Sequence, residues 1–157
     1  MILSFSGDLA YRDVAGGKLK MLMPADFINV PKEAYKKHYA DEPVPDYFYC
    51  NKDTSEYVAL MKMPNRMADL SQAKQMGQMA LLDSTTKVHF NDTITVNGNK
   101  IYLLDMDSKL GRKPESIKTF IINIPDGTVM GMISCNLALK KTWLPVSDQM
   151  FRSIKLI

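Results

Sequence analysis

The chain has 157 residues, of which 46% are hydrophobic and 24% are charged, and this composition is typical of one globular domain. Its net charge of +3 is too small to indicate a nucleic-acid-binding protein, which usually carries a concentrated basic patch. No apolar run approaches the roughly 20 residues that cross a bilayer as a helix, so the sequence predicts no transmembrane segment.

The first 17 residues form an N-terminal arm to which the sequence assigns no regular structure. A Gly-Gly pair at 16–17 ends the arm as a turn, and no linker follows, so we expect a single domain over residues 1–157. The arm lacks a basic leader, and its apolar residues are too few for an export signal. We therefore expect a cytoplasmic protein from the chain as given, or an exported one if a signal peptide has been removed.

The next part of the chain predicts three strands and one short helix. Residues 18–23 alternate lysine with leucine and methionine, as a strand with one buried face does. Residues 31–39 predict a short helix, because proline suits its first position and lysines suit its end. Residues 47–50 and 56–63 flank a polar turn and predict a hairpin.

A longer helix is predicted over residues 69–82, where apolar side chains recur at helical spacing. Asp69 is suited to cap its first turn, with Gln72 completing a capping box. The segment that follows, 85–96, predicts one strand interrupted by a bulge at 91–92.

Four consecutive strands are predicted between residues 93 and 135. Asn97-Gly98 supplies the two positive-φ positions of a type I′ turn, so residues 93–96 and 100–107 form a hairpin. Pro125-Asp126-Gly127 is a second turn signal, between strands 118–124 and 128–135. A final helix is predicted from residue 144 or 145 to 152, with Pro145 in its first turn, followed by a short extended end.

The central strands carry apolar residues on both of their faces. A sheet with one solvated face alternates more cleanly between apolar and polar residues. We therefore expect an α+β fold in which a mostly antiparallel central sheet is sandwiched between helices, with the two longer helices on opposite sides.

The order of these elements resembles that of the PsbP-like superfamily. A glycine-led strand ends in Pro24 before a short helix, and a long helix, two hairpins, a final helix and the closing segment 151–156 follow. This superfamily includes the photosystem II oxygen-evolving P-subunit, the Ran-binding Mog protein and the DcrB-type bacterial proteins. The resemblance spans residues 17–157. It implies an α/β/α sandwich and a non-enzymatic role in binding or scaffolding other proteins, and no family functional residue matches a position of this chain.

Methionine is unusually frequent, with 12 residues. Pairs separated by two positions recur in three predicted strands, so the members of each pair share a sheet face: Met21 and Met23, Met61 and Met63, Met130 and Met132. Such pairs can hold a soft metal or form an adaptable apolar surface. Core packing beneath a helix is the favoured interpretation, because no histidine or cysteine cluster accompanies them.

The sequence shows no pattern of catalytic or metal-binding residues. Cys50 and Cys135 are expected to be buried thiols, and a disulfide between them requires their strands to be neighbours. His38 and His89 have no carboxylate or cysteine at ligand spacing. Asp105 and Asp107 are expected at a solvated strand end that faces Lys109 and Arg112. We therefore predict no catalytic residue, cofactor or metal. The alternatives are a small enzyme or ligand-binding domain assembled from distant residues, and a thioether metal binder.

The candidate partner-binding residues are two tyrosines and two basic residues. Tyr47 and Tyr49 belong to the most aromatic segment, where alternation either exposes both tyrosines and buries Phe48 or does the reverse; exposed tyrosines often anchor interfaces. Arg112 and Lys113 belong to a basic loop suited to an acidic partner. We expect a protein partner, no nucleic acid, and a monomer or homodimer.

Overall fold

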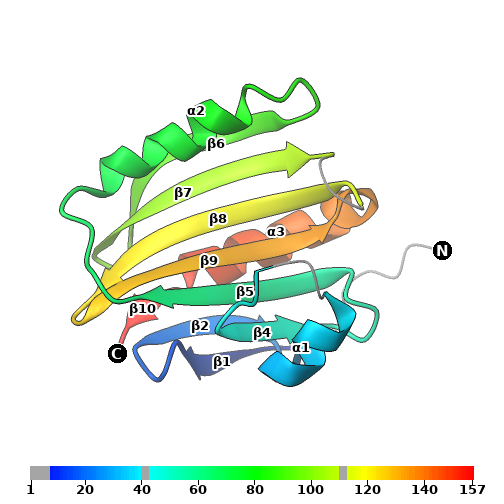
Figure 1. Cartoon of the computed structure of the whole chain (residues 1–157). Coiled ribbons are helices and arrows are strands. Elements are labelled where there is room, and N and C mark those ends of the chain that lie inside the picture. Colours follow the sequence, from blue (N-terminus) through cyan, green and yellow to red (C-terminus); the bar gives the residue numbers. More distant parts are fainter. Residues whose placement is uncertain (1–7, 40–42, 110–112) are drawn as a thin grey trace.

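The molecule is built around an antiparallel sheet of seven strands (Figure 1), in a computed structural model that describes residues 8–39, 43–109 and 113–157. The strands follow the order β3-β4-β5-β9-β8-β7-β6. Pairing of β5 with β9 brings together strands that are far apart in the sequence. The strand bounds are β3 (Ile28–Asn29), β4 (Tyr47–Cys50), β5 (Glu56–Met63), β6 (Lys87–Val96), β7 (Asn99–Ser108), β8 (Glu115–Ile124) and β9 (Gly127–Asn136).

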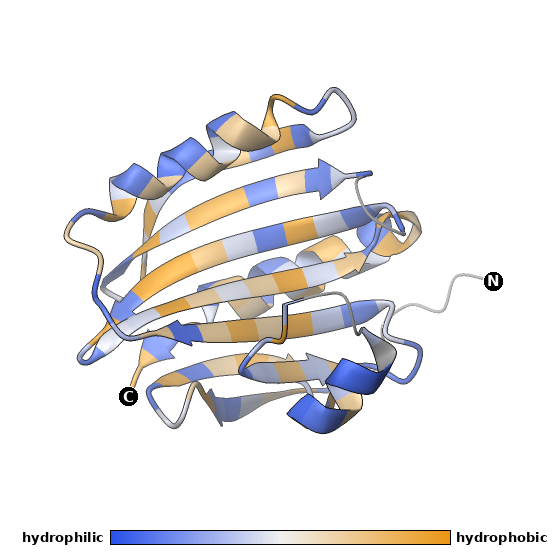
Figure 2. Cartoon of the chain, in the orientation of Figure 1, coloured by the Kyte–Doolittle hydropathy of each residue, from blue (hydrophilic) through white to orange (hydrophobic). Residues whose placement is uncertain are grey.

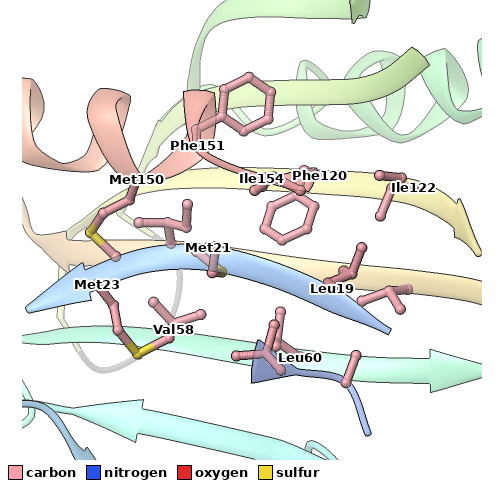
Figure 3. Packing of buried hydrophobic residues seen from close by; sticks show 14 of the residues in the cluster. Leu19, Met21, Met23, Val58, Leu60, Phe120, Ile122, Met150, Phe151 and Ile154 are labelled. Carbon is pink, nitrogen blue, oxygen red and sulfur yellow. The ribbon is translucent and has the colours of Figure 1, made fainter. Parts of the chain in front are cut away.

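One side of this sheet, which we call the core face, is covered by α3 (Lys140–Arg152) and a small second sheet. The second sheet has the order β1-β2-β10, with β1 (Leu9–Val14), β2 (Leu19–Pro24) and β10 (Lys155–Leu156). Figure 3 shows Met21 and Met23 of β2 packed with Met150 of α3 against the central strands. These side chains are at most 1% exposed. The strand with one buried face that was predicted for residues 18–23 is therefore present.

The other side, which we call the outer face, carries two helical segments that lie apart from each other (Figure 1). The 3₁₀ turn η1 (Leu70–Ala73) and α2 (Lys74–Ala80) pack on β6 and β7. The short helix α1 (Lys32–His38) places Tyr35 against Phe48 of β4. The helical segment formed by η1 and α2 and the helix α3 therefore lie on opposite sides of the sheet, and the predicted sandwich is confirmed.

The predicted hairpin at Asn97-Gly98 is present. Asn97 and Gly98 have φ angles of 48° and 79°, as a type I′ turn requires. The Asn97 amide also donates hydrogen bonds of 3.0 Å to the carbonyl oxygens of Arg152 and Ile154. This turn therefore anchors the end of α3 to the sheet.

Four local features differ from the prediction. Part of the N-terminal arm forms β1, which pairs with β2. The irregularity in β6 lies between Val88 and Phe90 instead of at 91–92. The Asp69 carboxylate caps the amide of Ser71, but the helix begins as a 3₁₀ turn. The short strand β3 was not predicted.

The final helix begins earlier than predicted. It starts at Lys140, after a 3₁₀ turn η2 (Leu137–Leu139), and Pro145 lies inside it instead of in its first turn. Trp143 precedes this proline and is only 2% exposed in the core. Burial of the indole ring therefore outweighs the hydrogen bond that proline removes from the helix.

Candidate functional site

The predicted tyrosine surface is not exposed as a unit. Tyr49 is 6% exposed and belongs to the main core, and burial raises the pKa of its hydroxyl. The Arg12 guanidinium of β1 lies 5.7 Å from the centre of the Tyr49 ring. Tyr47 is half-buried on the same face. Since the small sheet covers both rings, the expectation that Tyr49 faces a partner is wrong. This cover was not foreseen, because no strand was predicted over residues 9–14.

The two halves of the predicted partner surface are not brought together. Arg112 lies outside the described residues, whereas Lys113 is exposed just before β8. Across the sheet, Tyr49 is in register with Val58 on β5, then with Ile133 on β9 and then with Lys118 on β8. Lys113 precedes Lys118 by five residues, so it lies beyond the row that contains Tyr49. The roles of Tyr47 and Lys113 in binding stay predictions.

Both cysteines are buried free thiols on opposite faces of the sheet. Cys50 packs on the outer face with Tyr35 and Phe48. Burial raises the pKa of Cys135, on the core face, to about 12. Neither thiol is therefore ionised near neutral pH. The side chain of His38 is not among the described side chains.

Asp105 and Asp107 were expected at a solvated strand end, but both are half-buried and paired with cations. Asp107 Oδ2 is 2.9 Å from His89 Nε2 and 2.8 Å from Lys140 Nζ. Burial acts to raise the pKa of Asp107, but hydrogen bonds from Lys140, His89 and Ser116 outweigh it and hold that pKa below its ordinary value.

Asp105 has a more buried cation beside it. Lys118 Nζ lies 3.6 Å from Asp105 Oδ2 and donates a 3.1 Å hydrogen bond to Ser147 Oγ in α3. Lys118 is only 4% exposed, so loss of its charge partner would leave a buried ammonium. Together with Asp107 and Lys140, this pair fastens the first half of α3 to β7 and β8.

Two shallow depressions lie on the described surface, and ion-paired or capping groups line both. The larger, about 660 Å³, contains Lys32 paired with Asp46 at 3.2 Å and Lys62 paired with Asp126 at 3.3 Å. The smaller, about 250 Å³, is lined by Arg66, Asp69, Lys100 and Asn123, among others. Neither contains a nucleophile with an adjacent base among these side chains.

The outer face between α1 and α2 has an uncovered centre. Figure 1 shows no helix in front of β5 and β9 there, although residues 43–46, which lead into β4, pass in front of β5. Figure 2 shows hydrophobic residues along both strands. Met61 lies opposite Met130, and Ala59 lies opposite Met132. All four side chains are partly or fully exposed, and Met61 is 40% exposed. We call Ala59, Met61, Met130 and Met132 the methionine strip.

Packed clusters border the strip on both long sides. On one side, Tyr57 and Ala59 pack against the cluster beneath α1. On the other side, Met130 packs against the cluster of η1, Tyr102 and Ile121. The strip therefore joins the cluster beneath α1 to the cluster beneath η1, with Ala59 and Met130 packed at its two edges.

Both ends of the strip are also held in place. The Tyr57 hydroxyl donates a 3.1 Å hydrogen bond to Glu115 at the start of β8. At the opposite end, the backbone of Met67 exchanges hydrogen bonds of 2.9 and 2.8 Å with the Asn123 amide. These hydrogen bonds hold the residues on either side of the strip in place. The periodicity of the sequence did not predict that the strip would be exposed.

The methionines divide by location. Among the described residues, only Met21, Met23 and Met150 are buried in the core. The pairs in β5 and β9 share the outer face, as their spacing predicts, but they are not fully covered by a helix. No group of three His, Cys, Asp or Glu side chains in the described ranges is arranged to hold a metal ion. No helix within these ranges is long and apolar enough to cross a membrane.

Three solved structures share this arrangement of elements. The cyanobacterial PsbP protein CyanoP from Synechocystis matches with a TM-score of 0.66 and 11% identity over 100% of this chain and 98% of its own. The Ran-binding protein Mog1p from Saccharomyces cerevisiae matches with a TM-score of 0.59 and 16% identity over 96% of each chain. LpqN, described as involved in cell envelope biogenesis of Mycobacterium tuberculosis, matches with a TM-score of 0.56 and 9% identity over 95% of this chain and 90% of its own.

No protein-family model matches the sequence, and no curated protein matches it. Identities of 9% to 16% with the solved structures show the fold alone. The described chain thus has the fold of these solved structures, and the fold expected from the order of its elements is confirmed.

Proposed function

We propose that this chain is a non-catalytic binding module that recognises another protein through the methionine strip. The observation that carries the proposal is the apolar centre of the outer face, which no described helix covers and where Met61 is 40% exposed opposite the partly buried Met130. An apolar patch held between fixed borders is a feature of protein interaction sites.

The chemistry of methionine supports this role. The side chain is unbranched and polarizable, so it adapts to partner surfaces of different shape. The strip lies on regularly paired strands, because β9 is hydrogen-bonded to β5 on one side and to β8 on the other. The strip thus combines adaptable contacts with a backbone that needs little ordering when a partner binds.

Two further observations favour binding over catalysis. The charged side chains in the larger depression already form ion pairs with each other. In addition, Mog1p, which shares the fold, is named for binding Ran. This likeness supports a protein partner as a class and does not identify one.

The test compares substitutions inside and outside the strip. Met61→Lys and Met130→Lys place a charge in the apolar floor, whereas Met79→Lys changes a 70% exposed methionine on α2. Proteins that co-purify with the wild-type chain from its native cell are quantified by mass spectrometry for each variant, after circular dichroism has verified folding. We expect the two strip variants to lose a partner that Met79→Lys retains. Equal recovery with all three variants would refute the proposal.

A further inference from the structure

The turn between β6 and β7 contains the one Asn-Gly pair of the sequence, Asn97 and Gly98. We infer that Asn97 is a site of spontaneous deamidation, and that attachment of this turn to the end of α3 controls the reaction. The amide is held while the turn is attached, and once it has reacted the attachment cannot re-form completely. Asn97 is not part of the methionine strip, so this inference is independent of the proposed function.

The reaction requires only water as a second reactant. The Gly98 backbone nitrogen attacks the side-chain amide carbon of Asn97, and a cyclic succinimide forms. The carbon–nitrogen bond of the amide breaks, and ammonia leaves with the proton that the Gly98 nitrogen gives up. Water then opens the ring at either of its carbonyl groups, which yields aspartate or isoaspartate. Glycine favours the attack because it has no Cβ to hinder the approach of its own nitrogen.

The hairpin itself requires this reactive pair. Asn97 and Gly98 have φ angles of 48° and 79°, and asparagine followed by glycine is the pair that adopts such angles most readily in a two-residue turn. Both residues are exposed to water. A Cβ at Gly98 would meet no atom within 4 Å, so the backbone conformation and not a lack of space selects the glycine. The pair that specifies the turn is therefore also the pair that allows the ring to close.

Two hydrogen bonds oppose this reaction in the folded chain. The Asn97 amide nitrogen donates to the carbonyl oxygens of Arg152 and Ile154, at 3.0 Å each. Arg152 is the last residue of α3, where the carbonyl groups have no partner within the helix. Ring closure expels the same nitrogen that donates both hydrogen bonds. Both must therefore break before ammonia leaves, and attachment of the turn slows deamidation.

The products cannot restore the attachment. Aspartate at position 97 has no side-chain donor when ionised, and its charge would face two carbonyl oxygens at the negative end of the α3 dipole. The basic side chains next to these carbonyls have other contacts. Arg152 pairs with Asp148 at 3.1 Å, and Lys155 Nζ lies 4.8 Å from the centre of the Tyr11 ring. Isoaspartate adds a carbon atom to the main chain, which does not fit a two-residue turn of defined φ angles.

The end of α3 has a second attachment that deamidation does not touch. Ser153 Oγ accepts a 2.7 Å hydrogen bond from the backbone amide of Leu22 in β2, and β10 pairs with the same strand. The residues that follow α3 therefore stay bound to the small sheet. We expect deamidation to loosen the turn between β6 and β7 and to leave α3 in place.

The first experiment follows deamidation of the wild-type chain at mildly alkaline pH, both folded and unfolded in urea. Peptide mass spectrometry separates Asn97 from Asn99, which lies two residues further on, precedes a lysine and serves as the internal control. In urea, Asn97 should react faster than Asn99, and Gly98→Ala should remove this difference because its Cβ hinders the attack. Folding should slow the reaction of Asn97 by about tenfold or more, since two hydrogen bonds must be lost.

The second experiment measures hydrogen exchange in two variants. Asn97→Asp reproduces one product, whereas Asn97→Gly removes both hydrogen bonds, keeps the positive φ angle and adds no charge. We expect the backbone amides of the turn between β6 and β7 to exchange faster in both variants than in the wild type, and fastest in Asn97→Asp. The amides of β4 and β5 should exchange as in the wild type, which verifies that the rest of the fold is intact.

The inference is overturned if Asn97 reacts at the same rate in the folded and unfolded chains, or faster when folded. It is also overturned if Asn99 reacts as fast as Asn97 in urea, or if Asn97→Asp leaves exchange in the turn unchanged. The comparison of rates uses the wild-type chain, so it decides the inference even where a variant does not fold. None of these outcomes bears on the methionine strip, which the Met61→Lys variant tests separately.

Discussion

Gly131 lies directly opposite Phe120 across the β8–β9 pair, and the Phe120 ring fills the space that a side chain at position 131 would occupy. A methyl group there would collide with Phe120 Cζ and would lie 2.8 Å from Leu60 Cδ2. Because Phe120 and Leu60 are both fully buried, neither side chain has free space to move into.

Gly131→Ala should therefore lower the free energy of unfolding by about 1–3 kcal/mol through overpacking. Urea denaturation monitored by circular dichroism measures this loss. Combining the change with Phe120→Leu should cost less than the sum of the two single changes, because the smaller side chain makes room. Additive losses would show that the ring and the glycine are not coupled.

The network of Asp107 with His89 and Lys140 predicts a dependence of stability on pH. The folded-state pKa of Asp107 is lowered, so its contribution is fully present above the pKa of the unfolded chain and is lost as the pH falls through the folded pKa. Wild type and Asp107→Asn should therefore differ in urea midpoint at pH 7, and the difference should shrink as the pH falls below the ordinary aspartate pKa of about 3.9. Since Asp105 lies on the same strand, Asp105→Asn is measured alongside it to separate the two carboxylates. A constant difference at every pH would contradict the assignment.

The exposure of individual methionines predicts the order of their oxidation. Hydrogen peroxide should convert Met79, 70% exposed, and Met61, 40% exposed, to sulfoxides before Met21 and Met150, which are at most 1% exposed. Peptide mass spectrometry at increasing reaction times measures this order. Sulfoxide at Met61 should weaken partner binding, because it makes the apolar floor polar. Rapid oxidation of Met21 in the native protein would indicate that the small sheet opens.

The two cysteines should resist thiol reagents in the folded protein. Both are at most 3% exposed, and burial raises both pKa values, that of Cys135 to about 12. Reaction with Ellman's reagent at pH 8 should therefore be slow until guanidinium unfolds the chain, after which both thiols react. Cys50→Ala and Cys135→Ala assign the two signals. Fast labelling of the native chain would show local opening at the corresponding strand.

Local features of the fold could be predicted from sequence, and distant pairings could not. Asn97-Gly98 specifies its hairpin through two adjacent residues with positive φ. By contrast, the sequence of β1 does not alternate cleanly between apolar and polar residues. Its Arg12 is held by hydrogen bonds of 2.9 and 2.8 Å that it donates to the carbonyl oxygens of Ala25 and Phe27. That interaction depends on a loop more than ten residues away, so the strand was missed.

The candidate site shows the same limit. Spacing of two placed Met130 and Met132 on one face, which the structure confirms. Whether that face is covered depends on where α1 and α2 pack, and periodicity carries no information about this. Alternation in residues 47–50 likewise left open whether the tyrosines or Phe48 would be covered, because part of the cover over Tyr49 comes from β1.

The unequal covering of the sheet's two sides separates the residues that keep the chain folded from the surface that we propose for recognition. Substitutions beneath α3 disturb a close-packed interior, whereas exchanges at Met61 or Met132 replace side chains that already contact water. A lineage that keeps the first set of residues can therefore change its ligand by altering a few positions in the second. Divergence of binding partners at nearly constant thermal stability is the evolutionary behaviour that such an architecture permits.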